Sequence, residues 1–300
     1  QQGKSEYKAS TADYIRPAFK KGLAIEQNIG VNPYKFGLIG STDAHSGLSS
    51  AEEGNFWGKM AKDSTPETKE RFGSISSSNG WNMSASGLAA VWAEENTREA
   101  IYAAFKRKEV YATSGPRLRV QMFAGWDFPE GAETSESFAL IGRQYGVPMG
   151  GDLVANDNDG KAPVFLLRAV KDPAGANLDR FQVVKGWIDN AGQQERVYNV
   201  AWSDGRQLDA SGNLPPVGNT VDVSSGRYTN TIGQPEFSLT WADPDFNPQQ
   251  SAFYYVRVLQ IPTPRNGLLD SLALELDQPP RGPKTIQERA YSSPVWYKPQ

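Results

Sequence analysis

The stretch FGLIGSTDAH, residues 36–45, places a short apolar run directly before an aspartate and the only histidine of the chain. An apolar run of this length is typical of a buried parallel strand. Asp43 and His45 are two positions apart, and residues i and i+2 of an extended segment point to the same side. A carboxylate and an imidazole at a strand end can therefore bind one metal ion, because open sheets and barrels place their sites there. The same spacing also suits a structural hydrogen-bonded pair, and the residues alone leave both readings open.

Helix and strand patterns alternate around this stretch, within residues 1–125. A helix is predicted within residues 11–28, with Gly30 as its C-terminal stop. Short buried strands are predicted at residues 87–92 and 110–113, separated by a helical segment. This alternation favours an α/β domain with a parallel sheet.

The pattern changes after residue 125, where short β runs are separated by Gly, Pro, Asn and Asp. The predicted strands lie at residues 164–170, 179–188, 196–202, 237–241, 253–260 and 293–297. Several of them alternate apolar and polar residues, which indicates a sheet with two different faces. We therefore predict an α/β domain over residues 1–125, followed by an all-β domain, an antiparallel β-sandwich, over residues 126–300.

Composition excludes several classes of function. The formal net charge of -3 gives no electrostatic footprint for nucleic acid or for an anionic membrane surface. No stretch approaches the roughly 20 apolar residues of a membrane span. The chain has no cysteine, which excludes disulfides and thiolate chemistry but leaves the compartment open.

Several motifs resemble known families. The string GSTDAH at residues 40–45 resembles the late metal-binding motif of the PHP superfamily, the polymerase and histidinol phosphatase domains. A narrower resemblance, to the DUF3604 family, runs from about residue 10 to the end of the chain. It rests on the strings ENTREAI at 95–101, RKEVYATSGPR at 107–117, YVRV at 255–258, PTPR at 262–265 and SSPVWY at 292–297.

The resemblance implies that residues 1–125 form the C-terminal part of a PHP-type β/α barrel. It implies a metal-dependent hydrolase in which Asp43 and His45 are catalytic residues and ligands of divalent ions. Zinc, manganese or iron would accept these donors. Water activated by the metal would attack a phosphoester, ester or amide of a small-molecule substrate. Family members also carry earlier motifs, including a His-x-His pair, so a preceding segment or another chain is expected to complete the barrel and the metal cluster.

Ser114 and Arg117 follow the strand predicted at residues 110–113 and are candidates for substrate binding. A guanidinium group at the rim of the site could hold a phosphate or carboxylate of the substrate. A structural salt bridge is the alternative role of Arg117. For Ser114 the alternative is a hydrogen bond within the turn.

Two other functions remain open on the sequence alone. The β-rich half also suits a non-catalytic module that binds glycans or proteins, since fold does not assign function. The chain could also be an inert fragment, because it lacks the earlier metal motifs. A bacterial periplasmic or secreted location agrees with the composition and the resemblance, although neither fixes the compartment.

Overall fold

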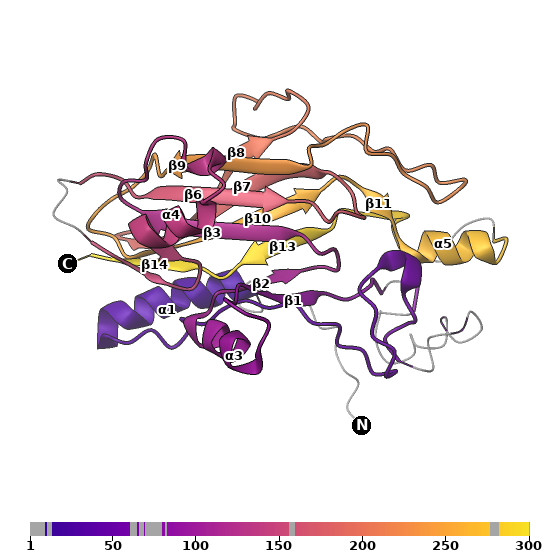
Figure 1. The fold of residues 1–300 in the computed structure, drawn as a ribbon, viewed down its shortest axis with the longest axis horizontal. Coiled ribbons are helices and arrows are strands. Elements are labelled where there is room, and N and C mark those ends of the chain that lie inside the picture. Colours follow the sequence, from indigo (N-terminus) through magenta and orange to yellow (C-terminus); the bar gives the residue numbers. More distant parts are fainter. Residues whose placement is uncertain are drawn as a thin grey trace.

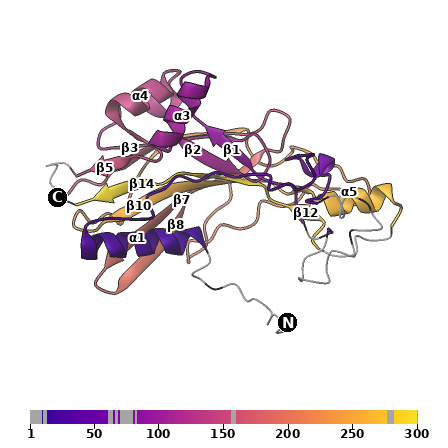
Figure 2. The ribbon, with the colours of Figure 1, turned by 90° about the horizontal axis from the view of Figure 1, so that it is seen from below.

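The structure of the protein is a computed structural model. It describes residues 10, 14–60, 65, 69, 80, 81, 83–155, 160–276 and 282–299. Within these residues β-strands predominate and form sheets of eight, four and two strands. The two larger sheets pack face to face, with helices on their outer sides (Figure 1, Figure 2). This arrangement fits a β-sandwich.

The eight-stranded sheet is built around β10. Its strands are β1 (Leu88–Val91), β2 (Val110–Thr113), β5 (Asp152–Val154), β7 (Leu178–Asp189), β8 (Gly192–Trp202), β10 (Ala252–Gln260), β13 (Arg289–Ser292) and β14 (Val295–Lys298). One edge of β10 pairs antiparallel with β7, and the other pairs with β13 and then β14. β1 and β2 extend the sheet beyond β13, while β5 pairs parallel with β14.

The hairpin between β7 and β8 shows how the sequence sets the turns. Asp189 Oδ1 accepts the backbone N–H of Ala191 at 2.8 Å, and Gly192 has a φ of 103°. An aspartate that bonds its own backbone two residues on, followed by a glycine in the left-handed region, is a common way to reverse a chain. The long strands β7 and β8 can therefore pair antiparallel from the turn to Arg180 and Trp202, with one irregularity between Phe181 and Gln182.

The four-stranded sheet is antiparallel, in the order β4-β3-β6-β9. Its strands are β3 (Arg119–Gly125), β4 (Gly146–Pro148), β6 (Val164–Val170) and β9 (Glu236–Ala242). β11 (Thr263–Pro264) and β12 (Thr285–Ile286) form a separate pair. The inner faces of the two larger sheets meet in one core, in which Met122, Phe165, Phe181, Tyr254 and Val256 are buried.

Helices lie on the outer faces of the sandwich and, in the case of α5, beyond one of its ends (Figure 1, Figure 2). They are α1 (Ile15–Ile29), α3 (Arg98–Arg107), α4 (Phe138–Tyr145) and α5 (Asn266–Ala273), with short 3-10 turns η2 (Glu53–Asn55) and η5 (Ala132–Thr134). α1 lies on the larger sheet, where Phe19 and Leu23 pack against Phe253 and other buried residues. α4 lies on the smaller sheet, where the ring of Phe138 packs against Phe123. None of the helices in the described part of the chain has both the length and the apolar character needed to cross a membrane.

The predicted PHP-type β/α barrel is wrong. Among the described residues neither large sheet closes on itself, and β1 and β2 pair antiparallel across the connection that contains α3. Residues 36–40, expected to form a buried parallel strand, belong to no ladder of the described sheets. They lie beside β2, with Gly37 next to Val110 and Gly40 next to Thr113. Leu38 N–H donates to Ser293 Oγ, between β13 and β14, at 2.9 Å, and Ile39 is 53% exposed. The physical reason is that a short apolar run specifies burial but neither the direction nor the partner of a strand.

Other predicted elements are confirmed. All six β runs predicted after residue 125 coincide with strands, and residues 110–113 form β2. The helix predicted within residues 11–28 is α1, and Gly30 ends it with a φ of 78°. β3, β13 and α4 were not predicted. The division of the chain at residue 125 stays a prediction, although β2 pairs with β13 and β3 with β6 across it.

Candidate functional site

Asp43 and His45 lie close together on the loop that follows residue 40. His45 Nε2 is 4.0 Å from Asp43 Oδ1, and their side chains are 53% and 67% exposed. Asp43 has a φ of 48°, a left-handed conformation that is uncommon for residues other than glycine. The backbone N–H of His45 donates to the carbonyl of Lys59 at 2.7 Å, which ties the loop to the following segment. The pair is therefore accessible to solvent and can offer two donors to one ion.

Lys59 is the ionic partner of Asp43. Its ammonium group contacts Asp43 Oδ2, and this hydrogen bond and charge lower the pKa of Asp43, with a smaller contribution from His45. The carboxylate is thus held in the ionised form that a metal ligand needs. The ammonium also takes the place beside the carboxylate that a metal cation would occupy.

The donor set fits a divalent metal only in part. Among the residues that the structure describes, no group of three or more His, Cys, Asp or Glu side chains is placed to hold a metal ion. Protein sites for catalytic zinc use three protein ligands. Asp43 and His45 offer two such donors, one fewer than a catalytic zinc site of this kind uses.

Ser114 shares a cavity with Asp43. The cavity has a volume of about 490 Å³ and is also lined by Lys59, Ser86 and Gly87. The Ser114 hydroxyl, however, hydrogen-bonds to the carboxyl group of Glu288, and its oxygen accepts the backbone N–H of Arg289 at 2.8 Å. The structure therefore brings Ser114 and Asp43 together, but the hydroxyl is already engaged in the cavity wall.

Arg117 lies outside that cavity. Its side chain is 70% exposed and forms an ion pair with Glu52 at 3.2 Å, while its backbone N–H donates to Asp172 at 2.7 Å. It lines a second cavity, of about 350 Å³. The structural salt bridge that the sequence left open as the alternative role of Arg117 is thus present. Substrate binding by Arg117 stays a prediction.

Glu288 connects the two cavities and was missed by the sequence reasoning. It lines the second cavity, is only 4% exposed, and bonds Ser114, which lines the first. Burial raises the pKa of Glu288 to about 7; the Ser114 hydrogen bond opposes this, and the charge of Glu53 adds to it. A buried carboxyl group with a shifted pKa in a cavity is a typical mark of a functional site. Glu288 lies directly before β13 and is buried only because the sheet forms around it, so no local sequence pattern indicated it.

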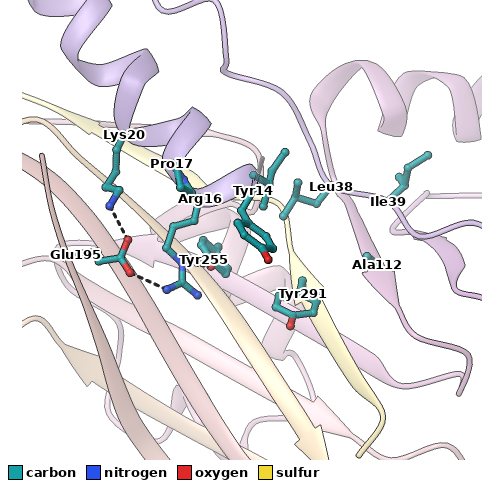
Figure 3. Close-up of a pocket in the computed structure, with 11 residues that line it drawn as sticks. Tyr14, Arg16, Pro17, Lys20, Leu38, Ile39, Ala112, Glu195, Tyr255 and Tyr291 are labelled. Atoms are coloured by element: carbon teal, nitrogen blue, oxygen red, sulfur yellow. Dashed lines mark hydrogen bonds and ion pairs between the residues drawn. The ribbon is translucent and has the colours of Figure 1, made fainter. Parts of the chain in front are cut away.

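A larger cavity lies elsewhere, between the start of α1 and the outer face of the larger sheet (Figure 3). Its volume is about 760 Å³. Arg16 Nε donates to the hydroxyl of Tyr255 at 2.9 Å, and Arg16 and Lys20 both pair with Glu195, at 2.9 and 2.6 Å. Apolar and aromatic side chains line the rest, namely Tyr14, Leu38, Ile39 and Tyr291. Asp43, His45, Ser114 and Arg117 do not line this cavity.

Fold and site together define a β-sandwich protein that carries an exposed carboxylate–imidazole pair beside a cavity. The chain belongs to the DUF3604 family: the family model, described as a protein of unknown function (DUF3604), matches residues 1–299. No curated protein and no solved structure matches the chain. The predicted family is therefore confirmed, while a relation to the PHP-superfamily hydrolases rests on the sequence resemblance alone.

Proposed function

We propose that this chain supplies Asp43 and His45 as two ligands to the divalent-metal site of a hydrolase. The observation that carries the proposal is the 4.0 Å approach of Asp43 Oδ1 and His45 Nε2 on one exposed loop. A carboxylate and a neutral imidazole suit zinc, manganese or iron. When bound, such an ion would lower the pKa of a water molecule and polarise the scissile bond. The substrate would be a small-molecule phosphoester, ester or amide, and the remaining ligands would come from beyond the described residues or from another chain.

Lys59 has a defined part in this proposal. It neutralises Asp43 in the absence of a metal and must leave the carboxylate when an ion binds. The released ammonium stays at the wall of the same cavity. There it suits a negatively charged oxygen of the substrate, since ammonium groups are strong phosphate binders.

Metal binding by the full chain tests the proposal. Titration calorimetry with Zn²⁺ and with Mn²⁺ should show affinity lowered at least about tenfold by Asp43→Asn or His45→Ala, because metal-site substitutions typically cost this much or more. Hydrolysis of p-nitrophenyl phosphate, p-nitrophenyl acetate and an anilide should fall with it.

The matched control is Asp127→Asn. Asp127 is exposed and pairs with Lys161, as Asp43 pairs with Lys59. Its substitution should leave metal affinity unchanged. Equal metal affinity in wild type, Asp43→Asn and His45→Ala would refute the proposed ligand roles.

A non-catalytic binding module is the second candidate, favoured by the position of the cavity beside α1. That cavity is mainly apolar and aromatic and lies apart from Asp43. A glycan array probed with the full chain in chelating buffer would test this function. Tight binding that persists in Asp43→Asn would support it, and absence of binding would count against it.

A further inference from the structure

The second cavity, lined by Arg117 and Glu288, carries a surplus of negative charge. Four carboxyl groups line it, against one guanidinium group. Three of the four are accounted for by nearby donors, so the charge of the cavity depends on how each group is paired.

Glu53 and Asp172 are held by hydrogen bonds from N–H groups. Glu53 accepts the backbone N–H of Ala85 at 2.6 Å and both the backbone and side-chain N–H groups of Asn266, at 2.6 and 2.8 Å. Asp172 accepts the backbone N–H groups of Arg117 and Ala174 at 2.7 and 3.0 Å. Both carboxylates therefore fix the backbone around the cavity, as carboxylates that accept several N–H groups commonly do.

Glu52 is paired as well. It forms the ion pair with Arg117, at 3.2 Å and largely exposed. This pair turns the guanidinium group of Arg117 toward Glu52. Of the lining residues that the structure describes, no other carries a positive charge.

Glu288 differs from the other three. It is 4% exposed, and one of its carboxyl oxygens receives a neutral hydroxyl, that of Ser114. Within the described residues its other oxygen has no hydrogen bond and the group has no ion pair. The charges of Arg289 and Arg265 act on it from a distance, and that of Glu53 opposes them. Ionised Glu288 is thus a buried anion without a direct counter-ion, a costly state that is relieved either by a proton or by a bound cation.

We propose that this cavity binds a guanidinium or alkylammonium group, with Glu288 as its counter-ion. The N–H groups of the ligand would donate to the unoccupied oxygen of Glu288. Tyr228 and Leu269 line the same cavity and would contact the alkyl part. The site is independent of the proposed metal ligands.

The test titrates the full chain with n-butylguanidinium and n-butylammonium, with n-butanol as the uncharged control. Binding at pH 8, followed by calorimetry, is expected for both cations and not for n-butanol. Affinity should fall about tenfold at pH 6, because a group with a pKa of about 7 is mostly protonated there. Equal binding of n-butanol, or no cation binding at 20 mM, overturns the proposal.

Substitutions identify the residue. Glu288→Gln should remove cation binding, whereas the exposed Glu130→Gln, a matched control, should leave it unchanged. Arg117→Gln removes the competing cation at the rim and should keep or increase the affinity. Unchanged binding in folded Glu288→Gln overturns the proposal, and so does Arg117-dependent binding of inorganic phosphate in place of the cations.

A second measurement uses the wild type alone, since a substitution at a buried position can unfold a chain. Cation binding at pH 7 should release about half a proton, because Glu288 is then about half protonated. Calorimetry in buffers of different ionisation enthalpy measures this number. Binding without proton release overturns the role of Glu288.

Discussion

At the scale of single residues, two buried carboxyl groups differ in whether a cation lies beside them. Asp243 forms an ion pair with Lys185 at 2.5 Å, and both side chains are almost fully buried. The hydroxyl of Tyr254 donates to the same carboxylate at 2.8 Å, and burial together with Asp243 raises the pKa of Tyr254 well above its ordinary value. Among the described residues, the Glu288 side chain has only the neutral hydroxyl of Ser114 as its hydrogen-bond partner. Asp243 thus has a cation and a hydroxyl donor in direct contact, whereas burial raises the pKa of Glu288.

This difference predicts a pH dependence of stability. The pKa of Glu288 is raised from 4.5 to about 7 in the folded chain, so between these values the folded state binds a proton that the unfolded state has lost. The free energy of unfolding must then fall by about 3 kcal/mol as pH rises from about 4.5 to about 7. Urea unfolding at pH 5 and pH 8 should show this loss in wild type relative to Glu288→Gln. A constant difference between the two proteins at both pH values would contradict the assignment.

At the scale of elements, α1 shows how a helix is fixed by a few aromatic contacts. Phe19 is fully buried, and its ring lies 5.4 Å from the rings of both Phe253 and Trp296. Ring pairs at this separation and near-perpendicular angles are favourable beyond the area that they bury. The polar side of the helix is held by Arg16 and Lys20, which pair with Glu195 of β8.

Phe19→Ala should therefore destabilise the chain by about 3–5 kcal/mol, because it leaves a cavity between helix and sheet. Thermal or urea unfolding measures this loss of free energy. Ile29→Ala is the control: Ile29 is in the same helix but 71% exposed, so its replacement should change stability by no more than about 0.5 kcal/mol. Similar effects of both substitutions would mean that α1 is not docked on the sheet.

At the scale of the whole molecule, one core joins residues from both sides of position 125. Val120 and Met122 of β3 are buried in the same cluster as Phe181 and Tyr254. β3 also pairs along its whole length with β6, on the other side of that position. The smaller sheet therefore depends on a strand that precedes residue 126.

A protein of residues 126–300 alone is thus expected not to fold cooperatively. It lacks the strand between β4 and β6, and its apolar sheet edge and core would be exposed. Circular dichroism during urea unfolding, with the full chain as reference, measures this. A sharp transition in the shorter protein would show that residues 126–300 form an independent domain.

Local structure followed closely from sequence patterns. Short β runs between turn residues located β6, β7 and β10, and Gly30 located the end of α1, because these patterns act over a few residues. The family could also be inferred from short motifs and is shown by the match over residues 1–299. For the candidate site, the adjacency of Asp43 and His45 was predictable, since two positions on one loop cannot lie far apart.

The tertiary structure alone decided what lies beside what. A barrel was inferred for residues 1–125, but β1 and β2 pair antiparallel. A short apolar run in the sequence does not determine which strand it will pair with. The hydrogen bond between Ser114 and Glu288 joins positions 174 residues apart, and no local sequence pattern predicts it. Burial and charge at Glu288 likewise arise from segments that meet only after the sheets have formed. Local propensity thus determined the elements of this protein, while long-range packing determined its architecture and the chemistry of its cavities.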